Sequence, residues 1–132
     1  MSNVGNIPIK IDLFGIGTAK GVIIRHLAPL SADAILNKMP IVLRGRFSFG
    51  KKDYWTLPGP QIFKGLNPKA LNKVEKGDII YNPKSDELII ILKNIEMPNK
   101  VNKIGKIIEN LELFFQAKNG LNTKFTKASL NT

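Results

Sequence analysis

The sequence contains no cysteine and only one histidine among its 132 residues. Disulfide bonds and thiolate metal sites are therefore excluded, and a reducing cytoplasmic location is expected. A single histidine, His26, cannot form a His-rich metal site. Nucleophilic triads need a Cys or a His, and the sequence offers only His26 for that role. We expect no metal and no cofactor, and we interpret His26 as a structural or solvated residue.

Long apolar runs are also missing. The longest spans residues 88–92, whereas a membrane-spanning helix needs about 20 apolar residues. The first ten residues lack the basic stretch followed by an apolar run that marks a signal peptide. We therefore expect no membrane association, with one domain over residues 7–120, a flexible N-terminus over 1–6 and a flexible C-terminal tail over 121–132.

Acidic residues are few, because 10 Asp and Glu stand against 20 Lys and Arg, which gives a net charge of +10. Such a charge can attract nucleic acid or another acidic partner. The basic residues are spread along the chain, however, and no nucleic-acid-binding motif accompanies them. Nucleic-acid binding is kept as an alternative, for which the basic residues would be the arginines and Lys93, Lys100, Lys103 and Lys106.

Alternation of apolar and polar residues predicts a mostly β domain. We expect strands over residues 7–13, 21–27, 41–49, 54–57, 79–81, 87–92 and 103–108, with a short one over 61–63. The run 87–92 is almost wholly apolar and is expected to be covered on both faces. Ser31 is predicted to cap a helix over 32–39, residues 67–71 to form a helical turn, residues 94–102 to form a loop, and residues 110–118 to form a second helix.

The alternation over residues 41–49 is the most informative. It places Phe47 and Phe49 on one strand face and Arg44 and Arg46 on the other. A hairpin would then bring Tyr54 and Trp55 within cross-strand reach. A guanidinium group beside an exposed aromatic ring can recognise a carboxylate or a peptide carbonyl. The alternative is that both arginines are merely solvated and the aromatic side chains lie in the core.

A second candidate pair is Asp86 and Glu87, which could in principle act as a general acid and base. Successive residues of a strand point to opposite faces. We therefore expect the two carboxylates to face different surroundings and not to converge on one substrate.

Three C-terminal stretches, residues 77–83, 88–91 and 104–111, together with the hairpin over 50–57, resemble the small cyclophilin-like proteins of bacteria and archaea. In that family a Gly-Asp-Ile-x-Tyr-x-Pro pattern leads into an apolar strand. A later Ile-Gly-Lys-Ile pattern precedes a short helix. The order and spacing of these patterns carry the resemblance.

The resemblance implies a closed eight-stranded cyclophilin-like β-barrel with two short flanking helices. Cyclophilins are peptidyl-prolyl cis-trans isomerases, in which an arginine donates to the imide nitrogen and so weakens the amide resonance that opposes rotation. Arg46 is the first candidate for that arginine, and Arg44 is the alternate. The cyclophilin glutamine and pocket phenylalanine would correspond to Glu87 and Ile89 here, and the loop over 96–101 lacks the family's tryptophan and histidine.

The sequence thus predicts a cyclophilin-like protein and favours a binding protein over an enzyme. Its expected ligand is a proline-containing peptide or a small molecule on the outer barrel face, contacted by Phe49, Tyr54, Trp55, Glu87 and Ile89. A divergent prolyl isomerase is the first alternative, and a basic nucleic-acid-binding barrel is the second.

Overall fold

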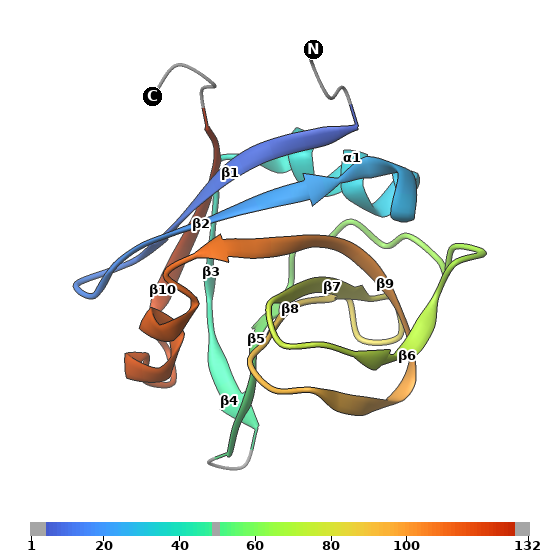
Figure 1. The fold of residues 1–132 in the computed structure, drawn as a ribbon. Coiled ribbons are helices and arrows are strands. Elements are labelled where there is room, and N and C mark those ends of the chain that lie inside the picture. Colours follow the sequence, from blue (N-terminus) through green and yellow to red (C-terminus); the bar gives the residue numbers. More distant parts are fainter. Residues whose placement is uncertain (1–4, 49–50, 129–132) are drawn as a thin grey trace.

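The computed structural model describes residues 5–48 and 51–128. Within them lie ten strands, one α-helix and two short 3-10 helices (Figure 1). The strands are β1 Asn6–Leu13, β2 Gly17–Ile24, β3 Ile41–Arg44, β4 Arg46–Ser48, β5 Lys51–Pro58, β6 Leu71–Val74, β7 Asp78–Asn82, β8 Glu87–Ile91, β9 Ile95–Glu109 and β10 Asn122–Lys127. The helices are η1 Arg25–Leu27, α1 Pro29–Lys38 and η2 Leu111–Gln116.

The strands form one antiparallel sheet, in the order β3-β10-β1-β2-β9-β7-β8-β5-β4, with β6 paired to β9. The prediction of a closed eight-stranded barrel is wrong, because this order has two ends. No ladder joins β3 to β4 or β5 in the described part of the chain. Instead the chain passes from β3 to β4 through Gly45, whose N–H donates to the Leu121 carbonyl at 3.0 Å and whose carbonyl accepts from Gly120 at 2.8 Å.

The opening hairpin predicted from residues 7–27 is present as β1 and β2. Its register pairs Leu13 with Gly17, so the turn is tight. Ile9, Ile11 and Leu13 are all at most 1% exposed. The period of two in the sequence therefore identifies the buried face of β1 correctly.

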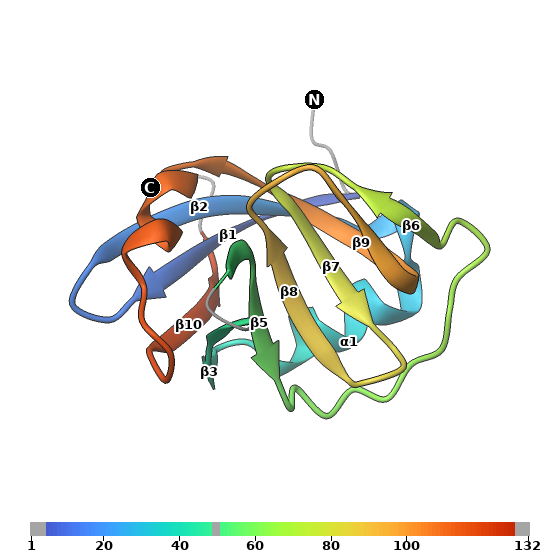
Figure 2. The same ribbon diagram turned by 90° about the horizontal axis from the view of Figure 1, so that it is seen from below.

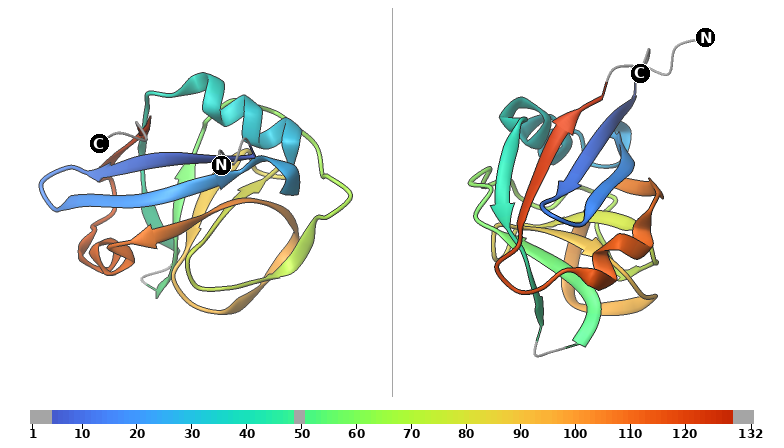
Figure 3. Two further views of the ribbon diagram at one scale, coloured as in Figure 1. Left: turned by 45° about the horizontal axis from the view of Figure 1, so that its top comes forward. Right: turned by 90° about the vertical axis from the view of Figure 1, so that its left-hand side faces the viewer.

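The C-terminal tail predicted over residues 121–132 differs from the structure, which has β10 there. This strand lies between β1 and β3, as Figure 3 (right) shows. Phe125 and Thr123 point inward and are at most 1% exposed. Because its partners are far away in the sequence, β10 gains its hydrogen bonds only once the sheet assembles.

The loop predicted over residues 94–102 is also wrong, because residues 95–102 belong to the 15-residue strand β9. Its first part pairs with β6, and the ladder there is irregular around Pro98. A proline removes one ladder hydrogen bond, which an irregular edge pairing tolerates. The helical turn expected over 67–71 and the short strand over 61–63 are likewise absent from the assigned elements, and β6 starts at Leu71.

The curled β9 creates a second apolar cluster. β8 is covered on both faces, as predicted. Leu88 and Ile90 belong to the main core, while Ile89 and Ile91 belong to the second cluster, together with Met97 of β9. β5, β8 and β7 lie side by side (Figure 2), and each contributes a side chain to this cluster or packs one against it.

α1 and η2 lie far apart along the curled sheet, as the left panel of Figure 3 shows. α1 starts earlier than predicted, with Pro29 in its first turn and no side-chain cap. Ser31 is not the cap; it is fully buried and accepts a hydrogen bond from the Asn102 amide at 3.0 Å. The second helix predicted over 110–118 is the shorter 3-10 helix η2. In the described ranges, no helix has both the length and the apolar character needed to cross a membrane.

Candidate functional site

The successive strands β3 and β4 each present one arginine on the outer surface. Arg44 and Arg46 are exposed, while Leu43 and Phe47 are each 8% exposed and face the core. The two-face alternation predicted for this segment is thus present in residues 41–48. Phe49, predicted to contact a ligand, lies outside the described residues.

Arg46 is distinguished from Arg44 by a partner from another strand. The Arg46 Nη2 donates to Oε2 of Glu87 at 3.2 Å. The arginine side chain is 57% exposed and the glutamate side chain only 15%. The hydroxyl of Ser85 donates to the other carboxylate oxygen of Glu87 at 2.7 Å, so both oxygens of Glu87 are held in place.

Strand register explains why these residues meet. Arg46 of β4 is opposite Thr56 of β5, and Thr56 is opposite Ile89 of β8. Glu87 is two residues before Ile89 and so shares its face. Residues 41 positions apart in sequence are thereby placed on one outer surface of the sheet.

A cavity of about 210 Å³ lies at this surface and is called the Arg46 cleft. It contains four of the predicted site residues. Its lining is Arg46, Ser48, Tyr54, Thr56, Asn82, Glu87, Ile89, Met97 and Pro98. The charged pair lies beside apolar side chains of the second cluster, of which Ile89 is 2% and Met97 4% exposed.

Trp55 and Arg44 do not contribute to the cleft. Trp55 is completely buried, its indole N–H donates to the Thr123 hydroxyl at 3.2 Å, and its ring meets the Phe47 ring edge-on at 4.8 Å between centroids. It points inward because it is opposite Phe47 in the β4–β5 ladder. The prediction that Trp55 contacts a ligand at this face therefore does not agree with its position, and Arg44 is absent from the lining.

Sequence reasoning did not identify Ser48, Thr56, Asn82 and Met97 as cleft residues. Ser48 and Thr56 carry a usable signal, because each lies two residues from a proposed residue of its own strand, and Asn82 is opposite Glu87 in the β7–β8 ladder. Met97 carries none, since it reaches the cleft only through the bend of β9. Asn82 also accepts a hydrogen bond from the Asn99 amide at 2.9 Å, which fixes the side of the cleft formed by β9.

Asp86, next to Glu87, faces a different environment, as expected. Its carboxylate accepts hydrogen bonds from the Tyr81 hydroxyl at 2.6 Å and from the backbone N–H groups of Gln61 at 2.8 Å and of Ile62 and Phe63 at 3.3 Å each. Burial opposes its ionisation, but the bonds from Tyr81 and the backbone outweigh this effect, and the pKa of Asp86 is lowered. Burial, followed by the bond to Asp86, raises the pKa of Tyr81. Asp86 therefore holds the loop after β5 and does not belong to an acid-base pair.

In residues 5–48 and 51–128, no three His, Cys, Asp or Glu side chains gather as a metal site would require. Of the lysines considered for nucleic-acid binding, Lys103 forms an ion pair with Asp78 at 3.0 Å. This pair reduces the positive charge that the set offers to a phosphate backbone.

Comparisons with known proteins show the fold alone. No protein-family model matches the chain, and no curated protein matches it. Among solved structures, the hypothetical protein AF2241 from Archaeoglobus fulgidus superimposes with a TM-score of 0.75 at 18% identity, over 94% of this chain and 96% of that one. McbB in complex with tryptophan gives a TM-score of 0.77 at 11% identity, over 92% of this chain but 45% of McbB.

Proposed function

We propose that the protein binds a small zwitterionic ligand, of the amino-acid type, in the Arg46 cleft. The observation that carries the proposal is the ion pair between Arg46 and Glu87 beside a cavity of about 210 Å³. An amino acid presents a carboxylate and an ammonium group a few atoms apart. Paired charges of both signs at a cleft are complementary to that arrangement.

Arg46 is suited to the ligand carboxylate. A guanidinium group has five N–H donors in a planar fork. Only one bond from Arg46, to Glu87, is found within the described residues. The exposed remainder of the fork can donate to a carboxylate in two parallel hydrogen bonds, which is the strongest form of this contact.

Glu87 is suited to the ligand ammonium group. Its two oxygens each accept one bond, from Arg46 and Ser85, and a carboxylate has about four acceptor positions. Tyr54, Ile89 and Met97 then offer apolar surface for the ligand side chain. Methionine is flexible and polarizable, which suits contact with an aromatic or aliphatic group.

The choice of a first probe is supported by McbB, whose structure holds tryptophan. Its similarity to this chain is one of fold and covers 45% of McbB, so tryptophan is taken only as an amino acid bound by a protein that contains this fold. A peptide terminus presents only one of these two groups, so it would engage either Arg46 or Glu87; we regard it as a second ligand class, in line with the peptide ligand expected from the sequence.

Arg46→Gln is expected to raise the Kd for tryptophan about tenfold or more, because a charge-assisted bond contributes roughly 1.5–3 kcal/mol. The matched control is Arg44→Gln, which removes the same charge from the neighbouring exposed position outside the cleft. Binding is followed by amide chemical shifts in two-dimensional NMR, with the residues of the cleft as reporters.

Tryptamine keeps the indole and the ammonium group of tryptophan but lacks the carboxylate. It therefore tests whether Arg46 acts through the ligand carboxylate. It should bind weakly to the unchanged protein, and Arg46→Gln should not weaken it, because that change removes a positive charge and frees Glu87 for the ammonium group. Equal losses of tryptophan binding in the Arg44 and Arg46 variants, or shifts scattered away from the cleft, would contradict the proposal.

The divergent prolyl isomerase is kept as a second candidate because Arg46 lies on the outer face of the strand where the resemblance places the cyclophilin arginine. We expect an Ala-Pro peptide to show no accelerated cis-trans exchange, since Glu87 compensates the charge of this guanidinium. Exchange spectroscopy by NMR measures this directly. Acceleration that disappears in Arg46→Gln but persists in Arg44→Gln would establish the isomerase instead.

A further inference from the structure

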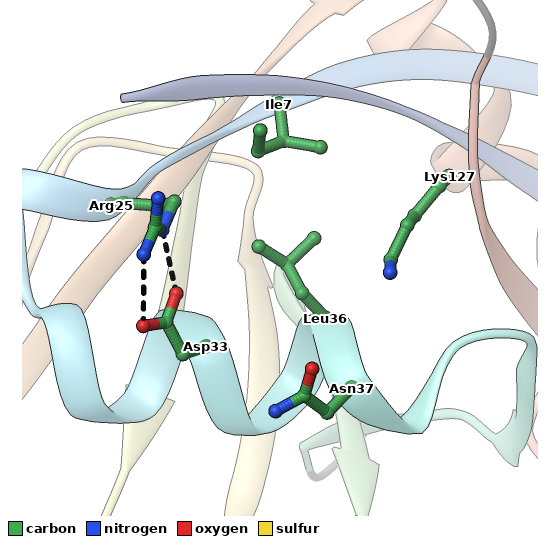
Figure 4. A pocket seen from close by; sticks show the side chains of 6 residues that line it. All are labelled: Ile7, Arg25, Asp33, Leu36, Asn37 and Lys127. Carbon is green, nitrogen blue, oxygen red and sulfur yellow. Dashed lines mark hydrogen bonds and ion pairs between the residues drawn. The ribbon is translucent and has the colours of Figure 1, made fainter. Parts of the chain in front are cut away.

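A second pocket, remote in the fold from the Arg46 cleft, lies between α1 and the strands β1 and β10, and is called the α1 groove. It has a volume of about 350 Å³ and is lined by Ile7, Arg25, Asp33, Leu36, Asn37 and Lys127. This volume is at the lower end of the range of small-molecule sites, about 300–1,000 Å³. Figure 4 shows Arg25 and Asp33 at one end, Lys127 at the other, and Ile7 and Leu36 between them.

One end of the groove is rigid and nearly neutral. Arg25 donates through Nε to Asp33 Oδ1 at 2.6 Å and through Nη2 to Oδ2 at 3.1 Å, a bidentate pair. The hydrogen bond between them raises the pKa of Arg25 and lowers the pKa of Asp33. Both groups therefore stay charged near neutral pH, and the charge of Asp33 is matched by Arg25 at contact distance.

The opposite end carries the positive charge of Lys127, which no described carboxylate compensates in an ion pair. Lys127 ends β10, and its ammonium group reaches toward the groove (Figure 4). The side-chain amide of Asn37 on α1 also lines the groove, and its NH₂ group can donate there when the amide turns about its last torsion. Together these two residues offer donors and one net positive charge.

The middle of the groove is aliphatic. Leu36 is 6% exposed and belongs to the main core, and Ile7 packs against that core. A ligand body lying across these two side chains would exclude water from apolar surface, which is favourable. The groove is thus apolar in the middle and singly positive at one end.

We propose that the α1 groove is a second ligand site, which binds a small monocarboxylate with an aliphatic body. The carboxylate is bound by Lys127 and the amide of Asn37, and the body lies over Ile7 and Leu36. A single compensating charge favours a monoanion, since the second charge of a dianion would meet no further cation among the lining residues at that end of the groove. This site is independent of the proposed function of the Arg46 cleft.

The test uses hexanoate as the probe and the full chain labelled for NMR. Saturable shifts are expected for the amides of Asn37 and Lys127 and for the methyl groups of Ile7 and Leu36. Lys127→Gln should raise the Kd for hexanoate at least fivefold. The matched control is Lys124→Gln, a lysine of the same strand that does not line the groove, and it should leave the Kd unchanged.

Two further arms make the result decisive. Hexan-1-ol has the same body without the carboxylate, so it should bind more weakly and equally to the unchanged protein and to Lys127→Gln. Arg46→Gln should leave hexanoate binding in the groove intact, which separates this site from the Arg46 cleft. Equal effects of Lys124→Gln and Lys127→Gln, or shifts spread over many surface lysines, would overturn the proposal and indicate general charge attraction.

Discussion

Gly45→Ala is expected to lower the free energy of unfolding by about 3 kcal/mol, the upper end of the usual cost of overpacking a core. A Cβ atom at this position would lie 1.9 Å from Cε2, 2.1 Å from Cζ2 and 2.2 Å from Nε1 of Trp55. The indole is a rigid ring with no exposed surface, so it cannot move aside cheaply. Urea unfolding measures the loss.

Gly65→Ala is the matched control, because a Cβ atom there would meet nothing within 4 Å. Its free energy of unfolding should stay within about 0.5 kcal/mol of the unchanged protein, as for most surface substitutions. If Gly45→Ala were as mild as Gly65→Ala, the packing of Trp55 across Gly45 would be wrong.

Trp55 also gives an independent spectroscopic measure, because it is the only tryptophan in the sequence. In Gly45→Ala the displaced indole should lose its bond to Thr123, and its emission should shift to longer wavelength even where the variant still folds. Trp55→Leu combined with Gly45→Ala should cost less than the sum of the two single changes, since the smaller side chain removes the clash.

The same contact explains why the aromatic residues of the β4–β5 hairpin were assigned incompletely from the sequence. Tyr54 and Trp55 are adjacent and must face opposite sides of β5, yet the sequence does not say which one faces outward. The choice follows from the register, which sets Trp55 opposite Phe47. A glycine at position 45 then admits the large ring beneath the chain between β3 and β4.

The elements predicted correctly are those whose signal is local. The alternation in β1 shows within the strand itself which face is buried, and the apolar run of β8 shows that both of its faces are. β10 has only one large apolar residue, Phe125, within Asn122–Lys127, and its strand geometry comes from pairing with β1 and β3. The first part of β9 likewise depends on β6, which the sequence did not predict as a strand.

In the candidate site, too, the sequence predicts what depends on local alternation and misses what depends on long-range pairing. Alternation predicts that Arg44 and Arg46 share the outer face, and both do. It cannot choose between them, because the choice is made by Glu87, which comes from β8 and is reached through two ladders. The open order of the sheet was also beyond the sequence, since its two ends are set by the pairing of β3 with the distant β10 and of β4 with β5.

The loop after β5 is held by hydrogen bonds to Asp86, and the second large loss of stability is expected when these bonds are removed. Gln61 and Phe63 have φ angles of 58° and 50°, and Asp86 itself has 52°, in the left-handed region that side chains disfavour. Such conformations persist only where the surroundings hold them. Here the Asp86 carboxylate accepts three consecutive backbone N–H groups and the Tyr81 hydroxyl.

Asp86→Asn is therefore expected to lower the free energy of unfolding at pH 7 by about 1.5–3 kcal/mol, the range for bonds to a charged acceptor. The amide has one acceptor oxygen, and its NH₂ group would face donors. Amide hydrogen exchange at residues 61–63 should accelerate, because their acceptor is lost. Urea unfolding gives the free energy, and Asp53→Asn serves as the control, since no hydrogen bond to its carboxylate is found among the described residues.

The effect should depend on pH with a definite sign. Because the pKa of Asp86 is lowered in the folded protein, its stabilisation is complete above the unfolded value, about 3.9, and is lost as the pH falls through the folded value. The difference between the unchanged protein and Asp86→Asn should thus be full at pH 7 and should shrink when unfolding is measured near pH 3. A difference that stays constant over this interval would show that the variant acts by altered packing, and that the charge of Asp86 does not hold the loop.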